Sequence, residues 1–533
     1  MKLKCCILIA VLYAGVTCYA QDWKVYPYKP AGSLLSFPAD EGRHTSEPVE
    51  WWYTSGHLTG SSGKTYNYML TYFYYPALGY DGFRILNVTD EATGKFYQDS
   101  KVLKYDSLST SNLYIRASVS TEGIETFTTK VDANNKLVPF EYLVHAASPL
   151  ATLDLNYVSV KRPLILGGDG YLEQGASSYT YYYSQTSNEV SGKLSLNGVT
   201  DDVTGTAWID RQFGNLNPFT GEKYEWFQMQ LSNGMDVNLW NIFTQNNTIP
   251  SNDKYRLLSA YVNDTTQYTI SDFKIVRLGF TWMPDSLACY SNKWRFTSDS
   301  NKIDLTISAK NNDNEVMWPF RFFEGATTIA GTINGKAVTG VGFAELLHNY
   351  HNPQLSVNAF AGDQYYTSLP ITWQLLNADE GSPVTYDLEY STDNKATFTP
   401  IVQGLTDTSY QWNTSSLSDG DKIWFKVTAH SVDDKLTGTA ISLSYATVIT
   451  GNSVGGKIKL FPNPVQGYLY IDPALKTGDG PCKIIDAKGQ VIYIFEKNIV
   501  SNKIDVRFLP GGVYFLQINS GDNTAVLKFI KSK

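Results

Sequence analysis

Apolar and polar residues alternate along most of the chain, and this alternation predicts its secondary structure. In the run 66–74, tyrosine and leucine side chains occupy every second position, which is the period of a strand with one buried face. Turn sequences such as Asn233-Gly234 and Asn334-Gly335 separate runs of this kind. No stretch keeps a helical period over three turns. We therefore predict an all-β protein.

Composition and length refine this picture. Aromatic residues make up 14% of the 533 residues, and aromatic side chains suit the half-buried surface of a sheet. At roughly 100–200 residues per domain, the length predicts three or four domains. The domain boundaries are suggested by changes in composition, by a polar stretch near 187–200 and by a Gly-rich linker at 451–456. The predicted segments are 1–20, 21–195, 196–352, 353–450 and 457–533.

The first segment has the features of a secretory signal. Lys2 and Lys4 precede an apolar run, and Cys18-Tyr19-Ala20 ends it with small residues at the outer positions. We expect cleavage after Ala20. A lipoprotein signal with Cys18 as the modified residue is the alternative, but Gly15-Val16-Thr17 lacks its usual pattern. No later stretch reaches about 18 apolar residues, so we expect no transmembrane segment.

Charge and cysteine usage exclude several function classes. The formal net charge is −8 and no basic patch is evident, which argues against nucleic acid as a partner. Only Cys289 and Cys482 lie beyond the signal, which does not support a disulfide framework. The six histidines form no group with metal-ligand spacing, and no dinucleotide loop opens a helix. We predict neither a metal nor any other cofactor.

The C-terminal segment carries several specific motifs. Lys459-Leu460-Phe461-Pro462-Asn463-Pro464 is followed by Ile484-Ile485-Asp486, by Leu509-Pro510-Gly511-Gly512 and by a basic end. These motifs resemble the C-terminal sorting domain of type IX secretion cargo. The resemblance implies a small β-sandwich that the type IX secretion machinery reads and that is usually removed. The protein is then expected in the medium or at the cell surface.

Residues 354–450 resemble a fibronectin type III module. Ile371-Thr372-Trp373 would form an early core strand, and in 423–429 a buried face alternates with a wet one. No chemistry is suggested. A spacer role and a sugar-contact role both remain open.

Three unusual motifs occupy the region before this module. They are Glu50-Trp51-Trp52-Tyr53 within 47–58, Trp208-Ile209-Asp210-Arg211-Gln212 within 205–214, and the pair 323–326 and 340–346. Together they resemble the AttH-like family, which includes carotenoid 1,2-hydratases. The resemblance implies two lipocalin-like antiparallel β-barrel halves with an apolar cleft. It does not imply a single activity, because family members differ in their chemistry.

Strand periodicity places the candidate site residues on defined faces. Glu50 and Trp52 share one face, Trp51 and His57 share the other, and Asp210 lies with Trp208 and Gln212. A carboxyl group among aromatic rings suits alkene hydration, because burial raises its pKa and a ring face stabilises a developing cation. The candidate catalytic residues are Asp210 first, then Glu50 and His57. The candidate ligand-binding residues are Trp51, Trp52, Tyr68, Tyr72, Trp208, Arg211, Tyr224, Trp226 and Gln228.

Alternative interpretations of these residues stay open. The tryptophans can simply fill barrel ends, and Asp210 can be a structural partner. Family hydratases are associated with a histidine near this motif, where this chain has Arg211 and Gln212. The sequence thus allows an enzyme that acts on an apolar, isoprenoid- or polyketide-like molecule, a non-catalytic carrier of such a molecule, or a glycan-binding surface protein. An apolar cleft that contains Asp210 favours the enzyme, whereas a flat exposed aromatic strip favours glycan binding.

Overall fold

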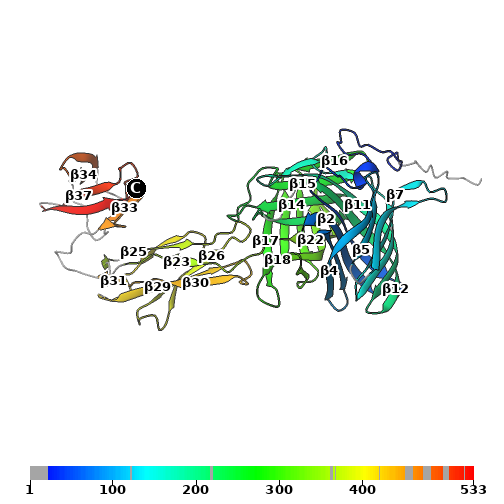
Figure 1. Ribbon diagram of the computed structural model, residues 1–533. Coiled ribbons are helices and arrows are strands. Elements are labelled where there is room, and N and C mark those ends of the chain that lie inside the picture. The colour runs from blue at the N-terminus through cyan, green and yellow to red at the C-terminus, as the bar shows by residue number, and fades with distance from the viewer. Residues whose placement is uncertain are drawn as a thin grey trace, which may run out of the picture. The chain divides into compact units, whose positions relative to one another are not determined.

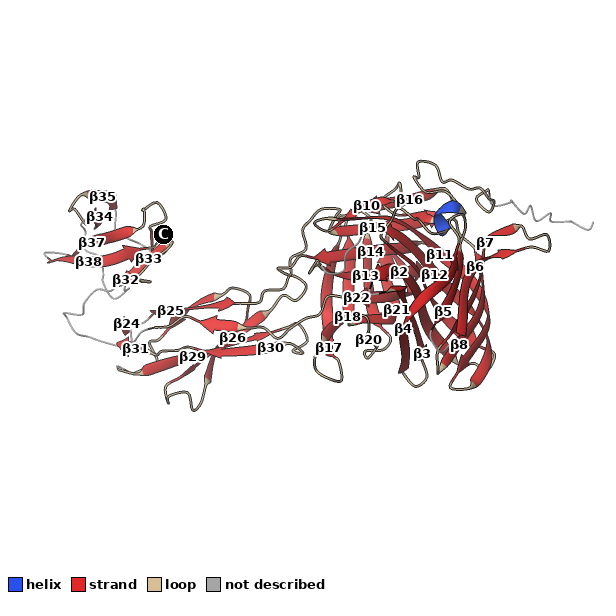
Figure 2. Cartoon of the chain, viewed as in Figure 1, coloured by secondary structure: helices blue, strands red, loops and turns tan. Residues whose placement is uncertain are grey.

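The computed structural model describes residues 22–77, 79–119, 123–215, 220–360, 364–366, 368–418, 420–449, 460–471, 482–495, 503–520 and 523–532. Throughout these ranges the chain is built from strands, and its one helical element is the short 3-10 helix η1 (Ala39–Glu41) (Figure 2). The chain divides into two compact units, 1–350 and 351–533. The all-β prediction is confirmed. The predicted signal segment lies outside the described residues.

The first unit begins with a sheet that closes into a barrel (Figure 1). Its strands follow each other as neighbours from β1 to β8, and β12 pairs with β1. Because β11 pairs with both β12 and β8, ten of these strands form a closed barrel in the described part of the chain. Short strands β9 and β10 pair with the start of β11. The strands are β1 (Val49–Gly60), β2 (Thr65–Ala77), β3 (Tyr80–Asp90), β4 (Lys95–Leu108), β5 (Tyr114–Val119), β6 (Gly123–Val131), β7 (Leu137–Ala147), β8 (Ala151–Ser159), β9 (Leu164–Ile165), β10 (Tyr171–Gln174), β11 (Ser178–Leu196) and β12 (Val199–Gly214).

A second antiparallel sheet completes this unit as a half-barrel. Its order is β16-β15-β14-β13-β22-β21-β19-β18-β17, and β20 pairs with β21. The strands are β13 (Lys223–Leu231), β14 (Asp236–Phe243), β15 (Arg256–Asn263), β16 (Thr266–Ile270), β17 (Lys274–Trp282), β18 (Cys289–Ser298), β19 (Ile303–Ala309), β20 (Glu315–Val316), β21 (Phe322–Ile333) and β22 (Lys336–Leu346).

The change from barrel to half-barrel falls between Gly214 and Lys223, later than the boundary expected at 195/196. The polar stretch that suggested that boundary is the hairpin between β11 and β12, which turns at Asn197-Gly198. Both residues have positive φ, which suits a tight hairpin. A hairpin tip and an interdomain linker share the same polar composition, so the sequence pattern alone does not separate them.

Side-chain alternation divides the barrel strands between two environments. Trp52 and Leu58 of β1 and Tyr68 and Tyr72 of β2 point into the barrel and belong to its core. The opposite face of β1 contributes Tyr53 to a second apolar cluster, which also contains Trp226 of the half-barrel. The other face of the half-barrel packs around a third cluster that includes Phe227 and Trp294. The second cluster therefore lies between the two sheets.

The unit 351–533 contains further small sheets. Strands β23, β25 and β28 form one sheet, and a second has the order β24-β31-β29-β26-β27 with β30 on β29. They share a core that includes Trp373 and Phe425. Assignment to the fibronectin type III class stays a prediction. The strands are β23 (Leu355–Val357), β24 (Gln364–Tyr366), β25 (Ser368–Leu375), β26 (Thr385–Ser391), β27 (Thr399–Leu405), β28 (Ser409–Asn413), β29 (Lys422–His430), β30 (Thr437–Ile441) and β31 (Ala446–Ile449).

The C-terminal segment forms two more sheets, with orders β32-β33-β36 and β35-β34-β37-β38. A core that includes Leu469, Ile484 and Leu516 lies between them. The strands are β32 (Leu460–Phe461), β33 (Tyr468–Ile471), β34 (Cys482–Asp486), β35 (Val491–Phe495), β36 (Lys503–Asp505), β37 (Gly512–Ser520) and β38 (Asn523–Lys531). Within the described ranges, no helix has the length and apolar character needed to cross a membrane.

Candidate active site

A cavity of about 420 Å³ opens between the outer face of the barrel and the half-barrel. Most of its wall is aromatic or aliphatic. The barrel contributes Trp51, Tyr53, Met69, Phe73, Phe83, Ile85 and Tyr182, and the half-barrel and its loops contribute Tyr224, Trp226, Trp240, Ile242, Phe320, Phe322 and Leu347. The charged residues in the wall are Asp210, Glu222, Lys223 and Glu345. Such a wall suits an apolar ligand that a few polar groups orient.

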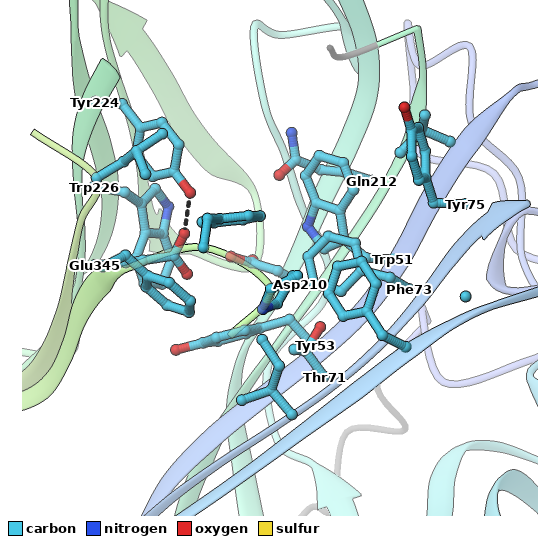
Figure 3. Close-up of a pocket in the computed structure, with 18 of the residues that line it drawn as sticks. Trp51, Tyr53, Thr71, Phe73, Tyr75, Asp210, Gln212, Tyr224, Trp226 and Glu345 are labelled. Atoms are coloured by element: carbon cyan, nitrogen blue, oxygen red, sulfur yellow. Dashed lines mark hydrogen bonds between the residues drawn. The ribbon is translucent and has the colours of Figure 1, made fainter. Parts of the chain in front are cut away.

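Strand register brings the central residues of the site together. On the barrel, Asp210 of β12 lies opposite Tyr53 of β1. On the half-barrel, Trp226 of β13 lies opposite Glu345 of β22, and Glu345 lies opposite Glu324 of β21. In Figure 3, Asp210 lies between the group formed by Tyr224, Trp226 and Glu345 and the rings of Trp51 and Phe73. Each sheet thus supplies carboxyl groups to the same cavity.

Asp210 is buried and accepts three hydrogen bonds. The Tyr182 hydroxyl donates to Oδ2 at 2.6 Å, while the Ser184 hydroxyl and Trp208 Nε1 donate to Oδ1 at 2.5 and 2.7 Å. Burial raises the pKa of Asp210 to about 7, although these donors act in the opposite direction. Asp210 can therefore exchange a proton near neutral pH.

Tyr182 connects Asp210 to the second sheet. Its hydroxyl oxygen accepts hydrogen bonds from Asn238 Nδ2 at 2.8 Å and from Trp226 Nε1 at 3.1 Å. Its ring also stacks on Trp240, with centroids 5.9 Å apart. These contacts hold the hydroxyl donor in place against Asp210 and align the two sheets around it.

Glu324 and Glu345 form a second carboxyl group cluster. Tyr53 donates to Glu324 Oε1 at 2.9 Å across the interface, and the Tyr224 hydroxyl donates to Glu345. Burial raises the pKa of Glu324 well above its usual range, and the neighbouring Glu345 raises it further. Burial also raises the pKa of Glu345, which lines the cavity. The two carboxyl groups therefore titrate as a coupled pair.

The aromatic wall is continuous on the barrel side. Phe73 stacks on Phe83 with centroids 4.4 Å apart and contacts Trp51 at 5.5 Å. Tyr53 packs edge-on against Trp226 at 5.6 Å, which joins this wall to the half-barrel. Ring faces of this kind stabilise a nearby cation.

Comparison with known proteins places this fold and site in a family. Residues 28–350, which make up more than half of the chain, match the AttH-like family. The chain belongs to the AttH-like family. Residues 459–532 match the secretion system C-terminal sorting domain, which indicates type IX export to the cell surface or the medium.

The AttH-like domain, residues 28–350, has relatives of known name. Kievitone hydratase of Fusarium solani subsp. phaseoli is 22% identical over 373 residues, which is 64% of this chain and 98% of that protein. The crystal structure of a putative AttH protein from Nitrosomonas europaea is 21% identical, has a TM-score of 0.50, and covers 61% of this chain and 99% of its own. A crystal structure of kievitone hydratase from Nectria haematococca is 18% identical with a TM-score of 0.49, over 61% of this chain and 98% of its own.

Six of the predicted site residues lie in or beside the cavity of the AttH-like domain. Asp210, Trp51, Tyr224 and Trp226 line it. Trp208 lies behind Asp210 as a hydrogen-bond donor, and Gln228 lies deeper in the interface, where its Nε2 donates to Ser55 Oγ at 3.4 Å. The predicted strand faces of β1 and β12 agree with this arrangement.

The predicted ligand-binding residues Trp52, Tyr68 and Tyr72 lie elsewhere, inside the barrel. The Tyr68 hydroxyl bonds that of Tyr157 at 2.6 Å, and the Tyr72 hydroxyl donates to Glu125 at 2.6 Å. The tyrosine row of β2 therefore packs the barrel core and does not contact the cavity. Alternation predicts which residues share a face but not whether that face turns inwards.

Glu50 and Arg211 form a buried ion pair on the inner face of the barrel, away from the cavity. Arg43 also pairs with Glu50. Although burial alone raises the pKa of Glu50, the Arg211 guanidinium and further hydrogen bonds bring it below its ordinary value. Glu50 is therefore ionised at neutral pH and has no proton to donate to a ligand.

His57 points towards the interface but does not line the cavity. Its Nδ1 lies 2.7 Å from Asn67 Oδ1, and its ring packs on Phe343 at 5.2 Å. Burial lowers the pKa of His57 to about 4, so the ring is neutral at physiological pH. In this position it acts as a packed interface residue.

Sequence reasoning missed the roles of Glu324, Glu345 and Tyr182. The two glutamates belong to motifs that already indicated the family, and alternation along β22 places Glu345 with Phe343. A glutamate flanked by apolar residues near the end of each strand was a usable signal. Among the residues that the structure describes, no group of three or more His, Cys, Asp or Glu side chains is arranged to hold a metal ion.

Proposed function

We propose that the AttH-like domain is an exported hydratase-like enzyme that adds water to a carbon–carbon double bond of an apolar, isoprenoid- or polyketide-like molecule. One observation carries this proposal. Asp210, whose pKa burial raises to about 7, lies in the wall of a largely aromatic cavity and faces a second carboxyl group, Glu345. Alkene hydration needs such a combination of proton donor, proton acceptor and cation-stabilising wall.

The chemistry follows from these groups. A cavity carboxyl group gives its proton to one alkene carbon, and the electron pair of the double bond forms the new C–H bond. The other carbon becomes a cation, which the faces of Trp51, Phe73 and Trp226 stabilise by roughly 0.5–2 kcal/mol per contact. Water attacks this carbon through its oxygen and loses a proton to the second carboxyl group. The product is an alcohol. One carboxyl group has lost a proton and the other has gained one, so no net proton is consumed.

The name of a relative supports the reaction class. Kievitone hydratase is 22% identical to this chain and is covered over 98% of its length. The histidine that family hydratases are associated with is replaced by Arg211 and Gln212, and Arg211 is engaged with Glu50. The proposal therefore assigns the acid and base roles to carboxyl groups.

The decisive experiment measures incorporation of oxygen from isotopically labelled water. Kievitone and a simpler prenylated phenol are incubated with the purified protein, and the products are analysed by mass spectrometry. We expect one labelled hydroxyl group per turnover. Asp210→Asn keeps the shape of the side chain but can neither release nor accept a proton, so its rate should fall about 10²–10⁴-fold while ligand affinity is retained. Asp154→Asn, an exposed change on β8, is the matched control.

A non-catalytic carrier is the second candidate, because the apolar lining alone would hold a lipid. In that case both probes bind without change and Asp210→Asn has no turnover to reduce. Glycan binding has less support, because the aromatic rings line a cavity and do not form an exposed strip. A spacer role for residues 353–450 is part of the same proposal.

A further inference from the structure

Two glutamates lie directly opposite each other on neighbouring strands of the half-barrel. Glu324 of β21 pairs in register with Glu345 of β22, so both side chains leave the same face of the sheet. Only Glu345 lines the cavity. Glu324 is 1% exposed, and its Oε2 has no hydrogen-bond partner among the described residues other than the neighbouring carboxyl group. Like charges directly opposite each other would be strongly unfavourable here.

The groups that face this pair offer no positive charge to relieve it. Tyr53 comes from β1 and Tyr224 from β13, and each donates one hydroxyl hydrogen bond to one glutamate. Asp210 of β12 is the third carboxyl group nearby. Its charge raises the pKa of Glu324, and the charge of Glu345 in turn raises the pKa of Asp210. Among the described residues, no Lys or Arg forms an ion pair with Glu324 or Glu345. A proton shared between the two carboxyl groups removes the repulsion.

We infer that Glu324 and Glu345 share one proton and together form the acid of the proposed reaction, with Glu345 delivering the proton to the ligand and Asp210 accepting the proton from water. The inference rests on the proposed function for its ligand but concerns residues that the function alone does not assign. Glu324 is a positioning residue, because it acts through Glu345.

The hydrogen bonds of Asp210 explain why it takes the accepting role. Trp208 Nε1 can only donate, and it occupies Oδ1 together with the Ser184 hydroxyl. Tyr182 donates to Oδ2 while its own oxygen already accepts two hydrogen bonds from Asn238 and Trp226. An ionised Asp210 carboxylate can accept all three hydrogen bonds. In a protonated Asp210, the hydrogen of the carboxyl group would compete with one of these donors. The acid and base thus come from opposite walls of the cavity.

Glu41 is a buried glutamate that has hydrogen-bond donors but no second carboxyl group beside it. It is buried beside Tyr26 and Tyr142 without a carboxyl neighbour, and burial raises its pKa to about 7. A carboxyl group that stays protonated well above this pH therefore needs a further cause. The paired register of Glu324 and Glu345 supplies it.

Infrared difference spectroscopy tests the shared proton without any ligand. The carbonyl band of a protonated carboxylic acid is followed in the full chain as the pH rises. We expect one such band to remain in the unaltered protein above the pH at which Glu41 has ionised. It should be lost there in both Glu324→Gln and Glu345→Gln, since either change leaves a single carboxyl group. Glu41→Gln is the control and should leave that band unchanged. Persistence of the band in either pair variant overturns the inference.

The pH dependence of turnover then tests the role of the pair. Activity requires at least one proton on the pair, so it falls as the pH rises through the last ionisation of the pair. In Glu324→Gln this alkaline limb should move down by about one to three pH units, with activity restored at lower pH. A purely structural role would reduce the rate equally at all pH values, and that result overturns the inference. Tyr53→Phe keeps both carboxyl groups but removes a hydrogen bond that lowers the pKa of Glu324. The alkaline limb should therefore move to higher pH in this variant, and a limb that moves to lower pH overturns the inference even if the Glu324 variant does not fold.

The two measurements separate failure of this inference from failure of the proposed function. If the infrared band behaves as expected but neither probe gains labelled oxygen, the shared proton stands and the hydratase function is wrong. If labelled product forms but the band titrates as a single residue, the function stands and the shared-proton acid is wrong.

Discussion

Asp210 and Glu50 lie on neighbouring, paired strands, yet their surroundings give their carboxyl groups opposite proton affinities. Glu50 contacts the guanidinium groups of Arg43 and Arg211, which hold it in the ionised form. The donors to Asp210 are neutral, so burial is the larger effect and its pKa rises to about 7. The chemical difference thus comes from the charge of the partners and not from the depth of burial.

At the residue scale, we predict that the Trp226 ring contributes to binding of an apolar ligand. Its ring lines the cavity, packs against Tyr53 and is held by its Nε1 hydrogen bond to Tyr182. Trp226→Ala should weaken binding of an apolar probe by about 1.5–3 kcal/mol through lost apolar contact area. Isothermal calorimetry with a prenylated phenol measures this change. Trp424→Ala, in the unit that lies outside the AttH-like domain, is the matched control, and equal affinities of all three proteins would contradict the cavity as the binding site.

Glu41 gives a prediction for stability as a function of pH. Burial raises its pKa from 4.5 to about 7, so the folded state binds more protons than the unfolded state between these values. The free energy of unfolding should therefore fall as the pH rises from about 4.5 to 7, by up to a few kcal/mol from this residue. Glu41→Gln should flatten that decline in chemical denaturation measured across the range. An unchanged slope would show that Glu41 titrates normally in the folded protein.

At the scale of elements, the hairpin of β21 and β22 determines where the glutamates lie. The two strands are paired from Phe323 opposite Leu346 to Ile333 opposite Lys336, and β22 also pairs with β13. Gly342 sits where β22 passes close to β13, because a Cβ there would lie 2.0 Å from the backbone oxygen of Gln228. Glycine is therefore required for this pairing, which also sets the register between Glu345 and Trp226.

Gly342→Ala should accordingly disturb the half-barrel. The added methyl group meets backbone, which cannot move aside as a side chain can, so we expect a loss of about 1–3 kcal/mol in the free energy of unfolding. Thermal unfolding measures it. Thr339→Ala changes an exposed position on the same strand and serves as the control. If both variants unfold at the same temperature, the close approach of the two strands is not required for stability.

At the scale of the whole molecule, the chain combines a domain that contains a cavity with an export signal. The AttH-like domain contains the cavity, and residues 459–532 form the sorting domain. The two functions use separate parts of the chain. Removal of the sorting domain after export would therefore leave every residue of the cavity in place.

Processing in the native host is the corresponding prediction. Protein recovered from the cell surface or the medium should begin near Gln21 and lack most of residues 457–533. Intact-mass measurement of that material determines both ends. A full-length C-terminus on exported protein would contradict processing, whereas protein confined to the cytoplasm would contradict export itself.

The sequence by itself determined that the protein is all-β, which family it belongs to, and which residues of each motif share a strand face. Alternation correctly separated Trp51 from Glu50 and Trp52, and it grouped Asp210 with Trp208. These features could be predicted because the period of a strand depends only on backbone geometry between adjacent residues. The sorting motifs were equally local, since they consist of short turns and strand ends.

Only the tertiary structure decided which strand face lines the cavity and which carboxyl groups lie close together. Barrel closure through β8 and β11 turns the tyrosine row of β2 inwards, and packing of the half-barrel makes Asp210, Glu345 and Glu324 neighbours. The hydrogen bond from Tyr53 to Glu324 joins residues 271 positions apart. The raised pKa of Asp210 arises from desolvation by both sheets. Contacts over such sequence distances depend on how the sheets close and pack, which no local pattern encodes.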